Sequence, residues 1–241
     1  MKRQLIVLFA LAAIPTLSLA QTADEILDKH VAALGGADKI AGIKTMDLEQ
    51  TMSVMGMDMT SKSTYVVGKS VRNDISVMGQ QITNVVDGET GWMINPMAGG
   101  STAQDLPADA VKMAKSTTEP QALQLAYLKT DKVPYELVGK EKYGDKDAFN
   151  LKVTRPEGVY NYYVDAANYQ LLGYKASVSM NGQSGETTAK FSNYKPVDGL
   201  TLPYTSELTS PMVPGGAAIT ATTTKVTVNS TVDPTVFAKP K

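Results

Sequence analysis

The stretch Val85-Val86-Asp87-Gly88-Glu89-Thr90-Gly91-Trp92-Met93-Ile94-Asn95-Pro96 indicates the fold of this chain more clearly than any other. Apolar residues flank an Asp-Gly pair, and this arrangement predicts two antiparallel strands joined by a tight turn. The return strand carries the only tryptophan of the chain. We therefore expect a β-hairpin over residues 85–96.

Segments on both sides of this hairpin alternate between apolar and polar residues, as strands with one buried face do. One face of the segment 46–54 is apolar except for Gln50. The apolar residues of that face are Met46, Leu48, Met52 and Val54. Residues 172–180 also alternate, and residues 219–228 are rich in threonine, which favours strands. The chain is therefore predicted to be dominated by antiparallel strands.

Helical signals are confined to two places. Thr22 and Glu25 have the spacing of a capping box, and the helix that they begin is expected to end at Gly35. Residues 105–129 contain two further helix-start signals, Asp105-Leu106-Pro107 and Thr118 as the N-cap of a capping box with Gln121. We expect two short helices there, the second strongly apolar. Residues 203–216 are rich in Pro, Gly and Ser and are predicted to form a long surface loop.

The domain organisation follows from these patterns and from the N-terminus. Lys2 and Arg3 precede an apolar run that ends in small residues before position 21, which is the pattern of a cleaved signal peptide over residues 1–20. The remaining residues, 21–241, are enough for one large β domain. We therefore predict a mainly β (α+β) fold, a single domain with an N-terminal helix and a helical insertion at 105–129.

Composition excludes several classes of function. The chain has no cysteine and a single histidine, His30, so disulfides and metal centres built from Cys and His are excluded. The formal net charge is −1, which argues against nucleic acid as a partner. No nucleophile motif is present. A pair of carboxylates could hydrolyse glycosides, but no pair is marked by its spacing. We expect no enzymatic activity, no catalytic residue, no metal and no cofactor.

Methionine is concentrated in the first half of the β region, and two interpretations of it remain open. Methionine fills irregular cores, and it is also frequent on surfaces that bind apolar partners. Trp92 has the same two interpretations, as a core anchor or as the wall of a lipid pocket. The methionines of this region are Met46, Met52, Met55, Met57, Met59, Met78, Met93 and Met97.

The order and spacing of Asp87-Gly88, Thr90, Trp92 and Asn95-Pro96 resemble those of the LolA/LolB-like superfamily of periplasmic lipoprotein carriers. The segment 194–199 also looks like that of exported family members known as outer-membrane lipoprotein-sorting proteins. The resemblance implies a strongly curved antiparallel sheet, an incomplete barrel, with the helices of residues 105–129 as a lid over its concave apolar face.

The resemblance also implies a function, a partner and a location. The chain would be a periplasmic carrier that binds lipid or lipoprotein acyl chains in an apolar cavity, for the sorting of outer-membrane lipoproteins. Its partners would be a lipid or an acylated lipoprotein and an inner- or outer-membrane receptor protein, and we expect a monomer. The alternative is a periplasmic sensor or interaction domain of the same fold that binds a membrane-protein partner.

Site residues follow from the resemblance and from the strand faces. In the carriers, a basic residue followed by proline after the second strand helps to hold the lid closed. Lys69 and Arg72 are the basic residues here, and no proline follows either of them. The residues expected to line the apolar cavity and lid are Met46, Leu48, Met52, Val54, Trp92, Ile94, Met113, Leu123, Leu125 and Tyr127.

Overall fold

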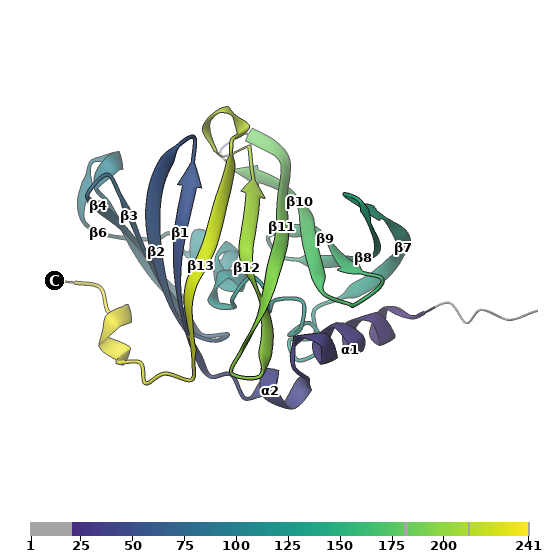
Figure 1. Cartoon of the computed structure of the whole chain (residues 1–241). Helices are drawn as coiled ribbons and strands as arrows, with labels where there is room; N and C mark the ends of the chain where they lie inside the picture. Colours follow the sequence, from purple (N-terminus) through teal and green to yellow (C-terminus); the bar gives the residue numbers. More distant parts are fainter. Residues whose placement is uncertain (1–20, 181–182, 212, 241) are drawn as a thin grey trace, which may run out of the picture.

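The structure, a computed structural model, describes residues 21–180, 183–211 and 213–240. The predicted signal peptide, residues 1–20, lies outside the described residues. Thirteen strands of the described chain form one antiparallel sheet in the order β6-β5-β4-β3-β2-β1-β13-β12-β11-β10-β9-β8-β7. The edge strands β6 and β7 do not pair with each other, so the curved sheet is an incomplete barrel (Figure 1). The predicted fold class is confirmed.

Most strands are eight residues or longer, and each is joined to the next in the sheet by antiparallel pairing. The strands are β1 Thr45–Val54, β2 Met57–Val66, β3 Ser70–Val77, β4 Gln80–Asp87, β5 Thr90–Asn95, β6 Gly100–Asp105, β7 Tyr135–Tyr143, β8 Lys146–Arg155, β9 Gly158–Asp165, β10 Leu171–Met180, β11 Gln183–Val197, β12 Leu200–Thr209 and β13 Ala218–Val228. The helical elements are α1 Ala23–Leu34, α2 Ala37–Ala41, η1 Pro96–Ala98, α3 Ala108–Met113, η2 Lys115–Thr118, η3 Pro214–Gly216 and η4 Pro234–Phe237. No helix of the described chain is both long and apolar enough to cross a bilayer.

The predicted capping box is present at the start of α1. The Thr22 hydroxyl accepts from the Glu25 N–H, and the Glu25 carboxylate accepts from the Thr22 N–H, both at 3.2 Å. Gly35 ends the helix with φ 132°, in the region that favours glycine. A Cβ at Gly35 would lie 2.6 Å from the Gly199 carbonyl oxygen, so this close approach of α1 to the β11–β12 turn also requires glycine.

The hairpin at residues 85–96 is confirmed, with its turn one residue later than the Asp-Gly pair predicts. Asp87 pairs with Thr90, so Gly88 and Glu89 are the central residues of the turn. The Asp87 carboxylate instead accepts a hydrogen bond of 2.6 Å from the Ser70 hydroxyl on β3. Asp87 therefore ties the hairpin to the neighbouring strand.

One strand runs into a segment that the sequence predicts as a loop, and another begins at a glycine. Residues 203–216 do not form one long loop, because β12 continues to Thr209. Pro203 is tolerated in β12 because the pairing of β13 with β12 begins only at Thr205, which leaves no β13 partner for the missing N–H. Gly100 begins β6, which pairs with β5 and becomes the edge of the sheet.

The insertion at 105–129 is less helical than predicted. It contains α3 and the short 3-10 helix η2, but residues 121–130 form successive turns instead of a second helix. The Thr118 hydroxyl donates to the Lys115 carbonyl at 2.8 Å, so Thr118 does not act as the predicted N-cap. Pro120 immediately precedes these turns, and the Leu123 N–H donates to its carbonyl at 2.8 Å.

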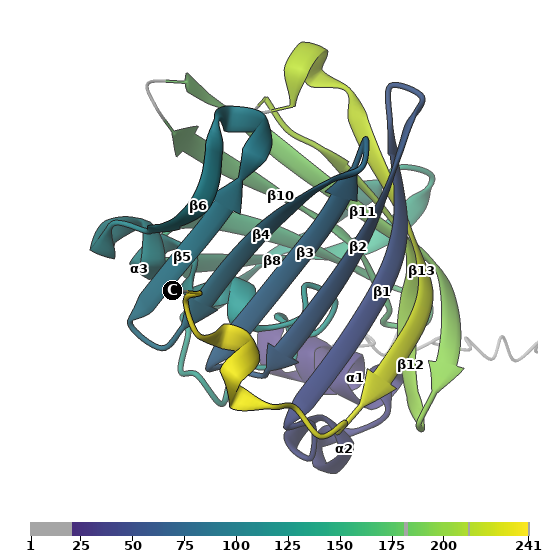
Figure 2. The same ribbon diagram turned by 90° about the vertical axis from the view of Figure 1, so that its left-hand side faces the viewer.

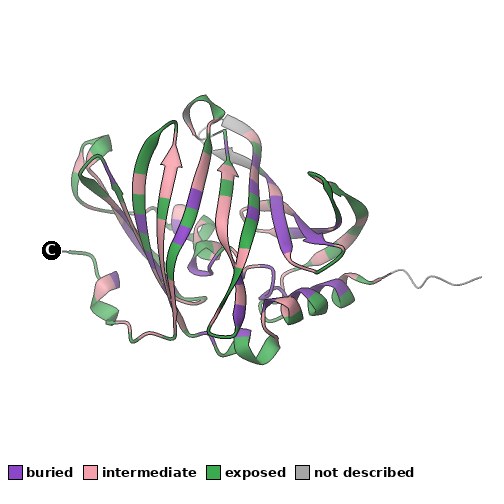
Figure 3. Ribbon diagram, in the orientation of Figure 1, coloured by how far each residue is buried: buried purple, intermediate pink, exposed green. Residues whose placement is uncertain are grey.

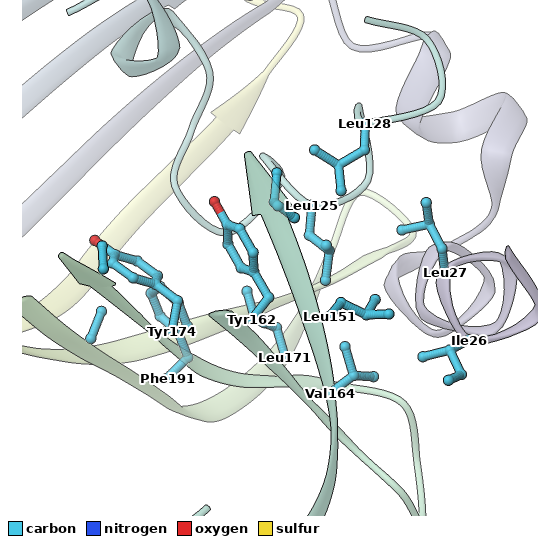
Figure 4. Close-up of a cluster of buried hydrophobic side chains, with 13 residues drawn as sticks. Ile26, Leu27, Leu125, Leu128, Leu151, Tyr162, Val164, Leu171, Tyr174 and Phe191 are labelled. Atoms are coloured by element: carbon cyan, nitrogen blue, oxygen red, sulfur yellow. The ribbon is translucent and has the colours of Figure 1, made fainter. Parts of the chain in front are cut away.

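The concave side of the sheet is filled unequally along its length. Over β8–β11, side chains of α1 and of the insertion pack against the strands, so that this half has a closed core (Figure 4). The buried residues of that core are Ile26, Leu27, Leu125, Leu128, Leu151, Val153, Tyr162, Val164, Leu171, Tyr174, Ala176, Ala189 and Phe191. Over β1, β2, β12 and β13 most residues towards the top of the view are only partly buried or exposed (Figure 3). This half of the sheet is where a cavity remains.

His30 is fully buried on α1. Its Nδ1 lies 2.9 Å from the Tyr169 carbonyl oxygen, and its Nε2 has no hydrogen-bond partner among the described residues. Burial lowers the pKa of His30 from 6.5 to about 4, because a charged imidazolium in the core would lose its hydration. The histidine is therefore a neutral part of the core.

We predict that His30 destabilises the fold as the pH falls from 6.5 to 4. In that window the unfolded chain binds a proton at this residue and the folded chain does not, which removes about 3 kcal/mol of stability. Urea unfolding at several pH values measures the free energy of unfolding of the wild type and of His30→Leu. Between pH 6.5 and pH 4 the wild type should lose more of it than the variant does. Parallel pH profiles for the two proteins would contradict the prediction.

Candidate functional site

A cavity of about 570 Å³ lies on the concave side of the sheet, between its strands and the insertion. Its volume falls in the range of pockets that hold small molecules and cofactors, roughly 300–1,000 Å³. The described residues that line it come from β1–β4, β11–β13 and the segment 106–124. The cavity is thus the space that the closed core leaves unfilled.

The strand register explains the wall of the cavity. In an antiparallel sheet, directly paired residues point to the same face, so each row of partners forms one band across the wall. Met46, Tyr65, Val71 and Val86 are successive partners on β1 to β4 and form an apolar band at the end nearest α1. All four are buried. Leu202 and Val226 add apolar surface from β12 and β13.

The insertion closes the cavity from the side opposite the sheet. Its apolar residues that line the cavity are Leu106, Ala114 and Leu123, and Leu123 is fully buried. The Gln121 amide nitrogen donates to the Tyr174 hydroxyl at 2.6 Å, and the Gln124 amide nitrogen donates to the Ser116 carbonyl at 2.9 Å. These two hydrogen bonds hold the turns of the insertion in place, since residues 121–130 do not form a regular helix.

Four of the predicted cavity residues line the cavity: Met46, Leu48, Met52 and Leu123. The other predicted residues lie elsewhere. Leu125 and Tyr127 are buried in the cores on either side of the insertion, and Met113 is 46% exposed at the end of α3. Val54 shares the concave face but lies at the end of β1, beyond the lining residues.

Trp92 and Ile94 lie on the outer face of the sheet, which corrects their assignment to the cavity wall. Trp92 pairs with Val85, whose neighbour Val86 lines the cavity, so alternation places Trp92 on the opposite face. There the C-terminal segment with η4 covers it (Figure 2). The Trp92 indole N–H donates to the Phe237 carbonyl at 2.8 Å. The tryptophan is therefore a core anchor for the C-terminus.

Arg72 belongs to the same outer-face assembly and does not hold the insertion. Its guanidinium pairs with Asp74 at 2.7 Å and donates to the Val236 carbonyl at 2.8 Å. Lys69 is exposed in the β2–β3 turn. That turn does contact the insertion, but through the backbone: the Gly68 N–H donates to the Thr118 carbonyl at 3.2 Å.

The methionines occupy three different environments. Met46 is buried in the core at one end of the cavity, and Met52 is a partly buried residue of its lining. Met55 and Met78 are 71% and 78% exposed at the tips of the β1–β2 and β3–β4 hairpins. The methionines therefore do not form one cluster, and a role of any of them in binding an apolar partner stays a prediction.

Sequence reasoning missed the buried ionisable group of the insertion, Glu119, which lines the cavity. Burial and the neighbouring Asp131 raise the pKa of Glu119, because both disfavour its ionised form. The guanidinium of Arg155 lies 3.8 Å from its carboxylate, too far for a hydrogen bond. These residues are scattered along the sequence, so no spacing could have marked them.

Comparisons with solved structures show a LolA-like fold. A LolA superfamily protein from Nitrosomonas europaea matches with a TM-score of 0.61 and 13% identity, over 91% of this chain and 99% of that one. A putative outer membrane lipoprotein-sorting protein domain from Vibrio parahaemolyticus matches with a TM-score of 0.57 and 17% identity, over 89% and 95%. A DUF1329 family protein from Desulfovibrio piger gives 0.58 and 12%, over 89% and 96%. No family model and no curated protein matches the sequence.

We predict that Trp92→Phe lowers stability and leaves ligand binding unchanged. The substitution keeps most of the ring but removes the indole N–H, so the buried Phe237 carbonyl loses its partner at a cost of about 1–3 kcal/mol. Chemical unfolding should show this loss, and the C-terminal amides should exchange faster with deuterium. A change in ligand affinity without a change in stability would contradict the outer-face assignment.

We predict that Glu119→Gln stabilises the protein above about pH 5. An acid whose pKa is raised by folding opposes folding once the pH exceeds its unfolded pKa of about 4.5, and the neutral amide removes that effect. The difference in melting temperature between variant and wild type should grow from pH 4 to pH 8. A difference that is constant or shrinks with pH would show that the Arg155 charge keeps Glu119 ionised.

Proposed function

We propose that this chain is a non-enzymatic carrier, in the periplasm, that binds the acyl chains of a lipid or lipoprotein in the cavity between its curved sheet and its insertion. The observation that carries this proposal is the cavity itself, which has a largely apolar lining and lies inside a LolA-like fold. The LolA superfamily and lipoprotein-sorting structures that share the fold support the choice of ligand class.

Burial of an acyl chain supplies the driving force. Each methylene moved from water into an apolar site contributes about 0.8 kcal/mol. Strands form most of the wall of the cavity, and their backbone hydrogen bonds are made within the sheet. The wall therefore keeps its shape when no ligand is bound. No bond in the ligand needs to be made or broken for such a carrier to work.

The proposal includes a route for ligand entry, by movement of the insertion. Residues 121–130 form turns and are tied to the sheet by a few side-chain hydrogen bonds, such as that of Gln121 with Tyr174. Segments with few regular backbone hydrogen bonds open at lower free energy than strands do. We propose that the part of the insertion beside Pro120 opens to admit the chain, while Leu125 and Leu128 stay in the core.

The first experiment is native mass spectrometry of the mature protein purified from its own cell envelope. A retained mass that matches a lipid or an acylated peptide would support the carrier and identify its cargo. A clean apo mass, together with no uptake of a fluorescent diacylglycerol, would contradict it. A stable complex with a membrane protein and no lipid would then favour the sensor alternative.

We predict that Leu48→Asp reduces uptake of fluorescent diacylglycerol at least tenfold, because it places a charge on the apolar wall of the cavity. Thr51→Asp is the matched control, since Thr51 is exposed on the outer face of the same strand. Circular dichroism establishes that both variants are folded. Normal uptake by a folded Leu48→Asp protein would show that Leu48 does not line the ligand-binding site.

A further inference from the structure

The wall of the cavity carries a band of polar side chains across its middle. The partners Ser63, Asn73 and Asn84 form one row on β2 to β4, next to the apolar row nearest α1. The following row contains Gln50, Ser61 and Thr223 on β1, β2 and β13. We call these six residues the polar belt, and all six line the cavity. Apolar residues, among them Met52 and Ile219, resume beyond the belt.

The belt is only partly satisfied by its own members. The Ser63 hydroxyl donates to the Asn73 amide oxygen at 2.6 Å, and the Gln50 amide nitrogen lies 3.3 Å from the Thr223 hydroxyl. Through their side chains, Asn84 and Ser61 make no hydrogen bond with another described residue. The Asn73 amide nitrogen and the Gln50 amide oxygen also have no partner among the described residues and can bind a ligand.

A plain acyl chain fits this wall poorly. Covering the belt with hydrocarbon would remove water from amides and hydroxyls without replacing its hydrogen bonds, at a cost of roughly 1–3 kcal/mol for each group left unpaired. A ligand that presents hydroxyl or amide groups at the same depth would keep those bonds. The belt therefore indicates a ligand with its polar part inside the cavity.

The charge of the lining restricts what that polar part can be. Among the described residues that line the cavity there is no lysine, arginine or histidine. Among these described lining residues Glu119 is the only carboxylic acid, and it belongs to the insertion. A phosphate or carboxylate head group would lose its hydration there with no cation in the lining to replace it. An uncharged group avoids that penalty.

We propose that the ligand is an uncharged amphiphile whose hydroxyl- or amide-bearing head group lies inside the cavity against the polar belt, with its acyl chains on the apolar surfaces beside it. A glycosylated diacylglycerol has this chemistry. The inference rests on the proposed carrier function and specifies its ligand class.

The test is competition between three lipids that have the same acyl chains. Monoglycosyl diacylglycerol, diacylglycerol and phosphatidylglycerol are each used to displace a fluorescent diacylglycerol from the mature protein. We expect the glycosylated lipid to bind most tightly and phosphatidylglycerol at least tenfold more weakly. Equal or tighter binding of phosphatidylglycerol would overturn the inference while leaving the carrier function intact. No binding of any of the three would overturn both.

The belt is tested directly by Asn73→Leu/Asn84→Leu, which replaces two amides with apolar groups of similar volume. We expect about a tenfold or greater loss of affinity for the glycosylated lipid, and no loss for diacylglycerol. Thr51→Val/Thr60→Val is the control, because it removes two exposed polar groups from the outer face of the same sheet. An unchanged preference for the glycosylated lipid in the folded belt variant would overturn the inference. If the double variant does not fold, Asn84→Leu alone gives the same comparison.

Discussion

The structure depends on how one segment, residues 121–130, covers the concave face of an open sheet. A sheet of this length must bury one face, and in the described part of the chain α1, α2 and this insertion cover it. Leu125 and Leu128 enter the core formed with α1, and Leu123 enters the core formed with β1–β4. The two leucines fill their half of the sheet completely, whereas Leu123 leaves a space beside it. The cavity therefore results from the same packing that stabilises the domain.

The outer face has a smaller cover of its own. The C-terminal segment places Phe237 against Trp92 and Val85, and its carbonyls accept from the Trp92 and Arg72 side chains. Donors on β3 and β5 thus hold a segment that has little secondary structure. Because β3 forms part of the cavity wall through its other face, the C-terminal segment supports that wall from behind.

The sequence predicts the features that local interactions determine. The capping box of α1 and the hairpin at residues 85–96 each involve neighbours in the chain, and both are present. The alternation of side chains along a strand also predicts that Trp92 and Met93 lie on opposite faces of the sheet. It does not predict which of the two faces the concave side. That choice depends on the C-terminal segment, which is 145 residues away from Trp92 in the chain. β12 likewise runs through Pro203 because of where β13 begins to pair, which no local pattern reveals.

A cavity with both apolar and polar bands selects its ligand chiefly by what it rejects. A hydrogen bond between ligand and belt replaces one that water already makes with each group, so its net gain is only about 0.5–1.5 kcal/mol. A ligand that leaves the belt unpaired, or that carries an unpaired charge into the cavity, loses several times that amount. Because the described residues of the lining include no lysine, arginine or histidine, the penalty falls most heavily on anionic lipids. Affinity would then come from the acyl chains, and specificity from six side chains on five neighbouring strands.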